Sequence, residues 1–252
     1  MADREDREDR QDDDRPIGVR SDVAAGQAVY SPVVLRMYDW FVLGFSNRLL
    51  WRCPSSELRR LYDRNVSSRH LDIGVGTGYF LDKAAWPTTN PAITLVDLNE
   101  NSLAFAADRI RRYAPRTVRA NALEPLPLPS SLPSSPSSSS SLSQAATSFG
   151  AFDSCGMCFL LHCLPGAIPE KAVVFDHVRP LLAPGARVFG ATILQGSAPR
   201  SALAQNLMNI YNKKGIFSNT SDRLEDLQAA LTARFTRVNV TMRGAVALFE
   251  AA

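Results

Sequence analysis

From His70 onward, short apolar runs alternate with longer stretches of helical spacing, and this alternation constrains the fold more than any other feature of the chain. Strands are expected at 70–73, 93–96, 117–120, 152–157 and 187–192, and helices at 79–86, 100–113 and 170–182. Strand–helix–strand units of this length form parallel sheets, because each helix returns the chain to the same end of the next strand. The sequence therefore predicts an α/β fold.

The C-terminal part of the chain shows a different pattern. Two helices are expected near 202–212 and 221–234, followed by alternating strands at 237–242 and 245–249 that an Arg243-Gly244 turn connects. Strands joined by so short a turn pair antiparallel. We expect a mostly parallel seven-stranded sheet with helices on both faces and a C-terminal antiparallel hairpin at one edge.

Two segments have too few apolar residues to build a core. Residues 1–15 contain eight acidic residues and four arginines, a net charge of −4, so the rest of this +3 chain carries +7. Residues 125–147 hold five prolines and the serine run 137–141. We predict a disordered charged tail at 1–20, then one domain over 21–252, with flanking helices at 30–50 and 55–62 and a disordered insert at 125–147.

Targeting and membrane signals are not expected. The tail has no apolar core of the kind a secretory signal peptide needs, and the longest apolar stretches elsewhere are interrupted by Arg36, Asp39 or His162. We therefore expect a cytoplasmic protein with no membrane span. Three of the four cysteines crowd into one apolar stretch, which does not suit a disulfide framework.

The most informative motif is Leu71-Asp72-Ile73-Gly74-Val75-Gly76-Thr77-Gly78, at the turn from the first strand into the first helix. Glycines let a ligand approach the backbone there because they have no Cβ. A dinucleotide fingerprint needs the spacing Gly-x-Gly-x-x-Gly, and a phosphate-binding P-loop needs a following Lys-Ser or Lys-Thr. Neither occurs here, so the loop indicates another ligand.

This loop resembles the acid-x-Gly-x-Gly-x-Gly signature of class I S-adenosylmethionine-dependent methyltransferases, and later motifs extend the resemblance from about Tyr30 to Phe249. Tyr38-Asp39 with Trp51-Arg52, the segment 152–165 and the segment 181–186 are similar to ubiquinone and menaquinone methyltransferases. The segment 212–219 (N-K-K-G-I-F-S-N) is similar to small methyltransferases of secondary metabolism. The resemblance implies the Rossmann-like fold of this class, with S-adenosylmethionine as cofactor and S-adenosylhomocysteine as product.

The resemblance also implies the cofactor-binding residues, which are Asp72, Gly74, Gly76, Gly78, Asp97, Leu98, Asn121, Ala122 and Cys158. Asp97, after the second strand, would accept hydrogen bonds from the ribose hydroxyls, although an acid there can also cap a helix. Asn121 replaces the family's Asp at the adenine amino group and can accept the same bond. Asp72 would bind the cofactor's amino group or cap the loop's own N–H groups.

On the acceptor side, Cys158 and Phe159 follow the fourth strand and are expected to line the site. His162 is either a general base or a packed, hydrogen-bonded histidine. Tyr30, Tyr38 and Trp40 would close a lid over the cofactor or lie in the core, and Tyr30 and Tyr38 would form the substrate lid together with Phe159. Cys155, Cys158, His162 and Cys163 invite a zinc site, but side chains three apart on a strand point to opposite faces, so no metal is expected.

These residues together predict methyl transfer to a small organic acceptor of secondary metabolism, with oxygen as the expected nucleophile. A nucleic-acid methyltransferase is the first alternative because of the +7 charge, but the basic residues are scattered and no Asn-Pro-Pro-Tyr motif follows the fourth strand. A methyltransferase-like binding protein without catalysis is the second. We expect no nucleic acid partner.

Overall fold

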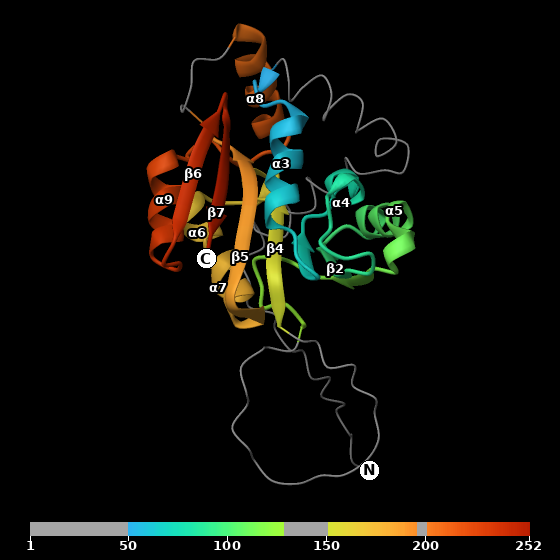
Figure 1. The fold of residues 1–252 in the computed structure, drawn as a ribbon. Helices are drawn as coiled ribbons and strands as arrows, with labels where there is room; N and C mark the ends of the chain where they lie inside the picture. The colour runs from blue at the N-terminus through green and yellow to red at the C-terminus, as the bar shows by residue number, and fades with distance from the viewer. Residues whose placement is uncertain (1–49, 129–150, 196–200) are drawn as a thin grey trace, which may run out of the picture.

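A seven-stranded sheet of order β3-β2-β1-β4-β5-β7-β6 forms the centre of the computed structural model, which describes residues 50–128, 151–195 and 201–252 (Figure 1). The strands are β1 Arg69–Ile73, β2 Ala92–Asp97, β3 Arg116–Arg119, β4 Phe152–Cys158, β5 Leu182–Ile193, β6 Val238–Arg243 and β7 Val246–Ala251. The first five are mutually parallel, and β7 pairs antiparallel with both β5 and β6. The predicted fold class is confirmed.

Strands are added on one side of β1 from β1 to β3, and on its other side from β4 onward. Strand β1 pairs in parallel with β2 on one side and β4 on the other, so Asp72 lies opposite both Leu95 and Gly156. Parallel strands end at the same edge, and the loops after β1, β2, β3 and β4 therefore gather there. In open α/β sheets, ligands bind at such a switch point.

Helices cover both faces of the sheet and create two apolar cores (Figure 1). One face carries α3 Ser55–Asn65, α4 Tyr79–Lys83, α5 Glu100–Arg109 and α8 Ala202–Lys213. The other carries α6 Ile168–Lys171, α7 Val173–Val178 and α9 Leu224–Thr232. Short 3-10 turns follow α5 at Arg111–Tyr113, β4 at Leu161–Cys163 and α7 at Arg179–Leu181.

Local chemistry explains several element boundaries. Asn99 caps α5, because its side chain accepts hydrogen bonds from the N–H groups of Asn101 and Ser102. Ser201 caps α8 in the same way, through the N–H of Ala204. At the hairpin, Gly244 has a φ of 59°, and a Cβ there would collide with the Trp51 carbonyl. The Arg243-Gly244 turn predicted from sequence thus requires its glycine.

Some predicted boundaries were wrong. The helix expected over 79–86 ends at Lys83, since the Trp86 indole instead donates to the Leu81 carbonyl. The single helix expected over 170–182 is divided into α6, α7 and a 3-10 turn that contains Pro180, which lacks the N–H needed to continue α7. The helix expected from 221 begins at Leu224.

The described chain extends into the predicted insert. Leu126 and Leu128, assigned to the disordered insert, are buried in the core beside α6 and α7, so the ordered chain extends at least to 128. The rest of the insert, the charged tail and the helix expected at 30–50, save its last residue, lie outside the described residues. Within the described ranges, no helix is long and apolar enough to cross a membrane.

Candidate functional site

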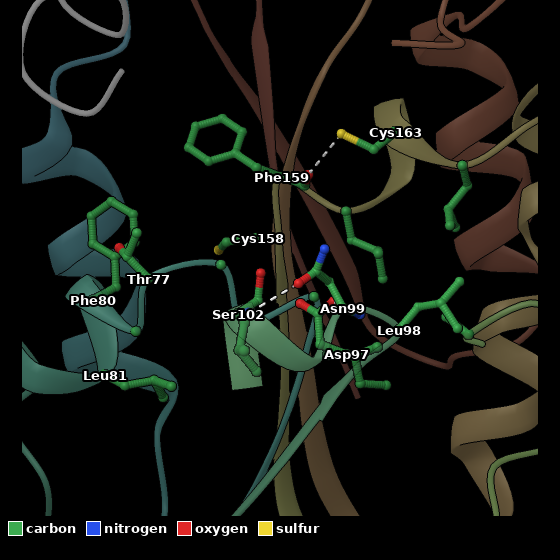
Figure 2. Close-up of a pocket in the computed structure, with 18 of the residues that line it drawn as sticks. Thr77, Phe80, Leu81, Asp97, Leu98, Asn99, Ser102, Cys158, Phe159 and Cys163 are labelled. Atoms are coloured by element: carbon green, nitrogen blue, oxygen red, sulfur yellow. Dashed lines mark hydrogen bonds between the residues drawn. The ribbon is translucent and has the colours of Figure 1, made fainter. Parts of the chain in front are cut away.

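A pocket opens at the carboxyl edge of the sheet, where the four loops after β1 to β4 meet. Its lining comprises the glycine loop and start of α4 (73–81), the segments after β2 (97–99 and Ser102) and β3 (120–122), the segment after β4 (158–160 and 163–165), and two residues from elsewhere, Tyr62 and Ile216. Figure 2 shows side chains from these separate loops surrounding one space.

The glycine loop forms one wall of this pocket. Gly76 has a φ of 52°, and a Cβ built on it would meet no atom within 4 Å. Gly78 has a φ of 68°, and its Cβ would come within 3.0 Å of the Ala106 backbone in α5. Gly78 therefore lets α5 pack closely, whereas Gly76 leaves its own backbone exposed to the pocket. Gly76 is therefore the position at which a ligand can lie closest to the backbone of the loop.

Asp97 lies at the end of β2 with its carboxylate facing the pocket (Figure 2). Its Oδ1 accepts the N–H of Asn99 at 2.9 Å, so the helix cap is Asn99 and Asp97 stands outside the helix. Burial raises the pKa of Asp97 to about 6, although N–H groups of Asn99 and of the glycine loop, at Gly76 and Val75, oppose this rise. The site thus holds a carboxylate in surroundings that disfavour its charge.

Leu98, Asn121 and Ala122, which the family resemblance implies as cofactor-binding residues, continue this side of the lining. The Asn121 Oδ1 accepts the N–H of Leu123 at 3.1 Å, and its Nδ2 lies 3.3 Å from Glu124 Oε1. These bonds orient the Asn121 amide. A carbonyl oxygen has two lone pairs, so Oδ1 keeps acceptor capacity for a ligand.

The segment after β4 provides the opposite side of the pocket. Cys158, Phe159 and Cys163 all line it, and burial raises the pKa of both thiols, that of Cys163 to about 12. Both thiols are therefore neutral. Phe159 has a φ of 63°, a strained value for an aromatic residue, while its N–H donates to the Ala191 carbonyl at 2.7 Å. Backbone strain of this kind is concentrated at functional sites.

Asp72 lies outside the pocket lining. Its side chain is 2 % exposed and accepts the hydroxyl of Tyr62 at 3.0 Å, with His70 Nε2 at 3.2 Å. Neither predicted role, binding the cofactor's amino group or capping the glycine loop, matches these contacts. The reason is strand alternation: Asp72 and His70 are two apart on β1 and so share the face that α3 covers.

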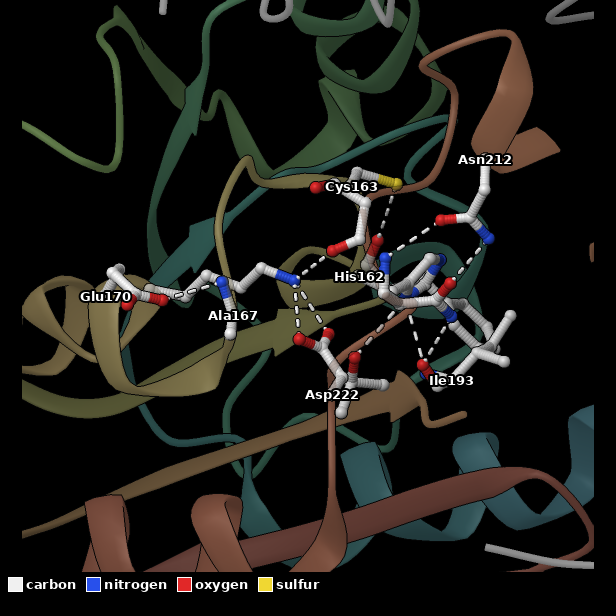
Figure 3. Close-up of polar contacts among 12 residues, drawn as sticks. His162, Cys163, Ala167, Glu170, Ile193, Asn212 and Asp222 are labelled. Carbon is white, nitrogen blue, oxygen red and sulfur yellow. Dashed lines mark hydrogen bonds and ion pairs between the residues drawn. The ribbon is translucent and has the colours of Figure 1, made fainter. Parts of the chain in front are cut away.

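His162, predicted as either a general base or a packed histidine, also lies outside the pocket lining. Its Nδ1 accepts the N–H of Ile193 at 3.3 Å (Figure 3). Its ring centroid is 4.5 Å from that of Phe217. Burial, and secondarily the charge of Lys171, lower the pKa of His162 to about 3. It is the packed, hydrogen-bonded histidine of the two predicted alternatives.

The remaining predicted residues divide into two groups. Tyr30, Tyr38 and Trp40 lie outside the described residues. Cys155 is buried in β4, and among the residues that the structure describes no group of three His, Cys, Asp or Glu side chains could hold a metal ion. Sequence reasoning missed Tyr62 and Ile216. Ile216 belongs to the recognised 212–219 segment, whereas no local pattern marks Tyr62.

The segment 212–222 is held against the core by polar contacts (Figure 3). Asn212 and Asn219 bond to each other twice, through a side-chain amide at 2.9 Å and a backbone N–H at 3.1 Å. The Lys171 ammonium donates to the Ser218 carbonyl at 2.6 Å and to both carboxylate oxygens of Asp222, at 2.9 and 2.7 Å. The Lys171 and Asp222 side chains are fully buried. These contacts fix the loop that carries Ile216 into the pocket.

Comparisons with known proteins agree with this architecture. Residues 71–188 match the family described as "Methyltransferase domain". The chain is 43% identical to the demethylluteothin O-methyltransferase of Streptomyces thioluteus, over 91% of both chains. It is 37% identical to the physcion biosynthesis cluster O-methyltransferase of Aspergillus chevalieri, over 90% of this chain and 94% of the relative.

Solved structures share the fold at low sequence identity. The complex of DhpI with S-adenosylhomocysteine superimposes with a TM-score of 0.59 at 15% identity, covering 93% of this chain and 96% of DhpI. The complex of PigF with the same ligand gives 0.57 at 14% identity, covering 88% of this chain and 59% of PigF.

Replacing Lys171 with Met should lower the free energy of unfolding by roughly 3–5 kcal/mol, because the buried Asp222 carboxylate loses its counter-charge. The double variant K171M/D222L should recover most of the loss. Arg111→Met removes a pair whose side chains are both 78% exposed and should change stability by less than about 1 kcal/mol. Urea unfolding measures the stability of all three variants. A K171M variant as stable as the wild type would contradict the buried ion pair between Lys171 and Asp222.

Asp97→Asn should stabilise the ligand-free protein at pH 7.5 and not at pH 4. The folded-state pKa of about 6 exceeds the ordinary value of 3.8, so folding favours protonated Asp97, and wild-type stability falls as the pH rises through this interval. The full shift corresponds to roughly 3 kcal/mol; partial solvent access reduces the expected gain to about 1–2 kcal/mol. Asp108→Asn, at an exposed carboxylate, is the control. Lower stability of Asp97→Asn at pH 7.5 would refute this prediction.

Proposed function

We infer the function from one premise: this chain belongs to the S-adenosylmethionine-dependent methyltransferases. We propose that it methylates a hydroxyl oxygen of a small organic acceptor from secondary metabolism, rather than nucleic acid, and that it acts in the cytoplasm. Relatives named as O-methyltransferases of luteothin and physcion pathways support the choice of oxygen. The observation that carries the proposal is the pocket wall at Gly76, open to a ligand beside the Asp97 carboxylate.

Two features of the pocket support a nucleoside ligand. The open side of Gly76 is a space that a Cβ would enter, so a ligand can lie against the backbone of the glycine loop. Asp97, at the neighbouring strand end, would accept hydrogen bonds from two ribose hydroxyls. We propose that Gly74, Gly76 and Gly78 cradle the cofactor while Asp97 holds its ribose.

The adenine would lie between the segments after β2 and β3. Leu98 and Ala122 provide apolar contact there. The Asn121 Oδ1 can accept a hydrogen bond from the adenine amino group with its remaining lone pair. Because Asn121 is uncharged, this bond lacks the charge assistance that the family's Asp provides, so its contribution to affinity should be smaller.

S-adenosylmethionine, when bound, supplies a methyl carbon on a sulfonium sulfur that a nucleophile can attack directly. The chain's part is to align an acceptor oxygen with that carbon and to exclude water. Phe80, Phe159 and Ile216 provide apolar walls, and the neutral thiols of Cys158 and Cys163 add to them. Direct displacement needs alignment and a place for the acceptor's proton, so we propose no metal in this reaction.

Gly76→Ala should weaken S-adenosylhomocysteine binding by at least about tenfold, because the new methyl group occupies the space meant for the ligand. Gly185→Ala is a matched control: Gly185 has a φ of 75°, and its Cβ would also meet no atom within 4 Å, but it lies away from the pocket. Both variants should lose similar stability from backbone strain. Isothermal titration calorimetry measures the affinity for S-adenosylhomocysteine, and thermal unfolding measures the loss of stability. Equal affinities in both variants would contradict the placement of the cofactor against Gly76.

Incubation of the purified full-length protein with S-adenosylmethionine and a panel of phenols, aromatic amines and thiols tests the reaction itself. We expect formation of S-adenosylhomocysteine together with methyl ethers of phenols, identified by mass spectrometry. Products methylated only on nitrogen or sulfur would contradict the proposed oxygen nucleophile. Tight binding of S-adenosylhomocysteine without turnover on any member of the panel would contradict the acceptor class.

A further inference from the structure

A continuous chain of side-chain hydrogen bonds runs through the sheet behind the pocket. The Tyr62 hydroxyl donates to Asp72 Oδ2 at 3.0 Å, and the same oxygen lies 3.2 Å from His70 Nε2. On the other side of the ring, His70 Nδ1 is 2.8 Å from Ser154 Oγ, which is 2.7 Å from Ser67 Oγ. These five residues come from α3, β1, β4 and the segment before β1.

Each hydroxyl in this hydrogen-bond chain has one hydrogen to donate, which limits the direction of the bonds. With the Ser67 hydroxyl donating to the Arg69 carbonyl at 3.0 Å, the bond between the two serines is donated by Ser154. Ser154 has then used its one hydrogen, and His70 donates to it from Nδ1. In this arrangement one proton lies between His70 Nε2 and Asp72 Oδ2 and completes the hydrogen-bond chain.

The pair of His70 and Asp72 sits in a recess that matches its shape. Both side chains are 2 % exposed or less. A Cβ on Gly156, opposite Asp72 in β4, would come within 2.5 Å of Asp72 Oδ2 and 3.4 Å of the His70 ring. Burial raises the pKa of Asp72, against the hydrogen bonds from His70 and Tyr62. The carboxylate is therefore a ready proton acceptor.

The two ends of this hydrogen-bond chain, Tyr62 and Ser67, line two different pockets. Tyr62 lines the pocket at the carboxyl edge, and its hydroxyl is within hydrogen-bonding reach of the Cys158 thiol in the same lining. Ser67 lines a second, more open hollow on the surface with Asp153, Arg187 and Arg237. The hydrogen bonds thus run from the first pocket to a residue that lines the second.

Among the titratable groups of the described lining, Tyr62 is the one hydrogen-bonded to a buried carboxylate. The titratable side chains of this lining are Tyr62, Tyr79, Asp97, Cys158 and Cys163. The thiols are neutral, and in the proposed function Asp97 accepts hydrogen bonds from the ribose. Among these groups, the hydrogen bonds place a buried carboxylate directly behind Tyr62.

We propose that Tyr62 is the catalytic residue that accepts the acceptor's proton, and that Asp72, His70, Ser154 and Ser67 relay a proton to the surface hollow. The inference rests on the proposed function. As the acceptor's O–H bond breaks, its proton binds Tyr62 Oη and the Tyr62 proton passes to Asp72. His70, in its imidazolium form, passes its Nδ1 proton to Ser154, Ser154 passes its own to Ser67, and Ser67 releases one to water. The acceptor loses one proton and solvent gains one, while the acceptor oxygen keeps the electron pair that attacks the methyl carbon.

A series of phenols of graded acidity separates this role from a structural one. Tyr62→Phe should lower kcat/KM by roughly 10²–10⁴-fold for weakly acidic phenols, which must lose a proton on the enzyme. It should have little effect on a nitrophenol that is already ionised at the assay pH. Tyr113→Phe, outside the pocket, should act like the wild type throughout. An equal loss across the series, or no loss, would overturn the proposal, provided that calorimetry shows unchanged S-adenosylhomocysteine affinity.

Proton exchange at His70 tests the outlet without any acceptor. In protein with ¹⁵N-labelled histidine, we expect a proton on His70 Nδ1 that exchanges with water despite the buried ring. Ser67→Ala should abolish this exchange on the NMR saturation-transfer timescale, whereas Ser68→Ala, at the exposed neighbouring position, should retain it. An unprotonated Nδ1, or equal exchange in both variants, would refute the relay. If the wild type methylates no phenol, the proposed acceptor class fails, and this exchange measurement still decides the relay.

Discussion

The parallel pairing of β1 with both β2 and β4 is the constraint on which the rest of the structure depends. It brings the ends of four strands to one edge, where the glycine loop, Asp97, Asn121 and Cys158 line a single pocket although they are far apart in sequence. The same pairing sets Gly156 opposite Asp72, which gives the carboxylate room behind that pocket. One arrangement of strands therefore creates both the ligand site and the polar chain beneath it.

Several features of this edge oppose stability. The backbone is left-handed at Gly76 and at Phe159, and Asp97 keeps a carboxylate where burial disfavours its charge. Such features persist because the surrounding packing holds them, and they are typical of sites that must accommodate a ligand. Away from this edge, the buried Lys171 ammonium is paired with the Asp222 carboxylate.

The parallel strand–helix units, the hairpin and the glycine-loop side of the pocket were predictable from sequence, because periodicity and the spacing of glycines are local signals. The roles of Asp72 and His162 were not. Both lie near the carboxyl edge in sequence, but strand alternation turns Asp72 toward α3, and the packing of Phe217 turns the His162 ring away from the pocket. The hydrogen bonds that join Tyr62, His70 and Ser154 depend on strand register and helix placement, which no single segment encodes.

Hydrogen–deuterium exchange of the full-length protein, with and without S-adenosylhomocysteine, tests the central claim that this edge binds the cofactor. The account predicts ligand-induced protection at 74–79, 97–102, 120–122 and 158–163, which are the segments that line the pocket. The outer hairpin strand β6 should not change. Protection confined to other segments, or no protection at a saturating concentration of the ligand, would contradict it.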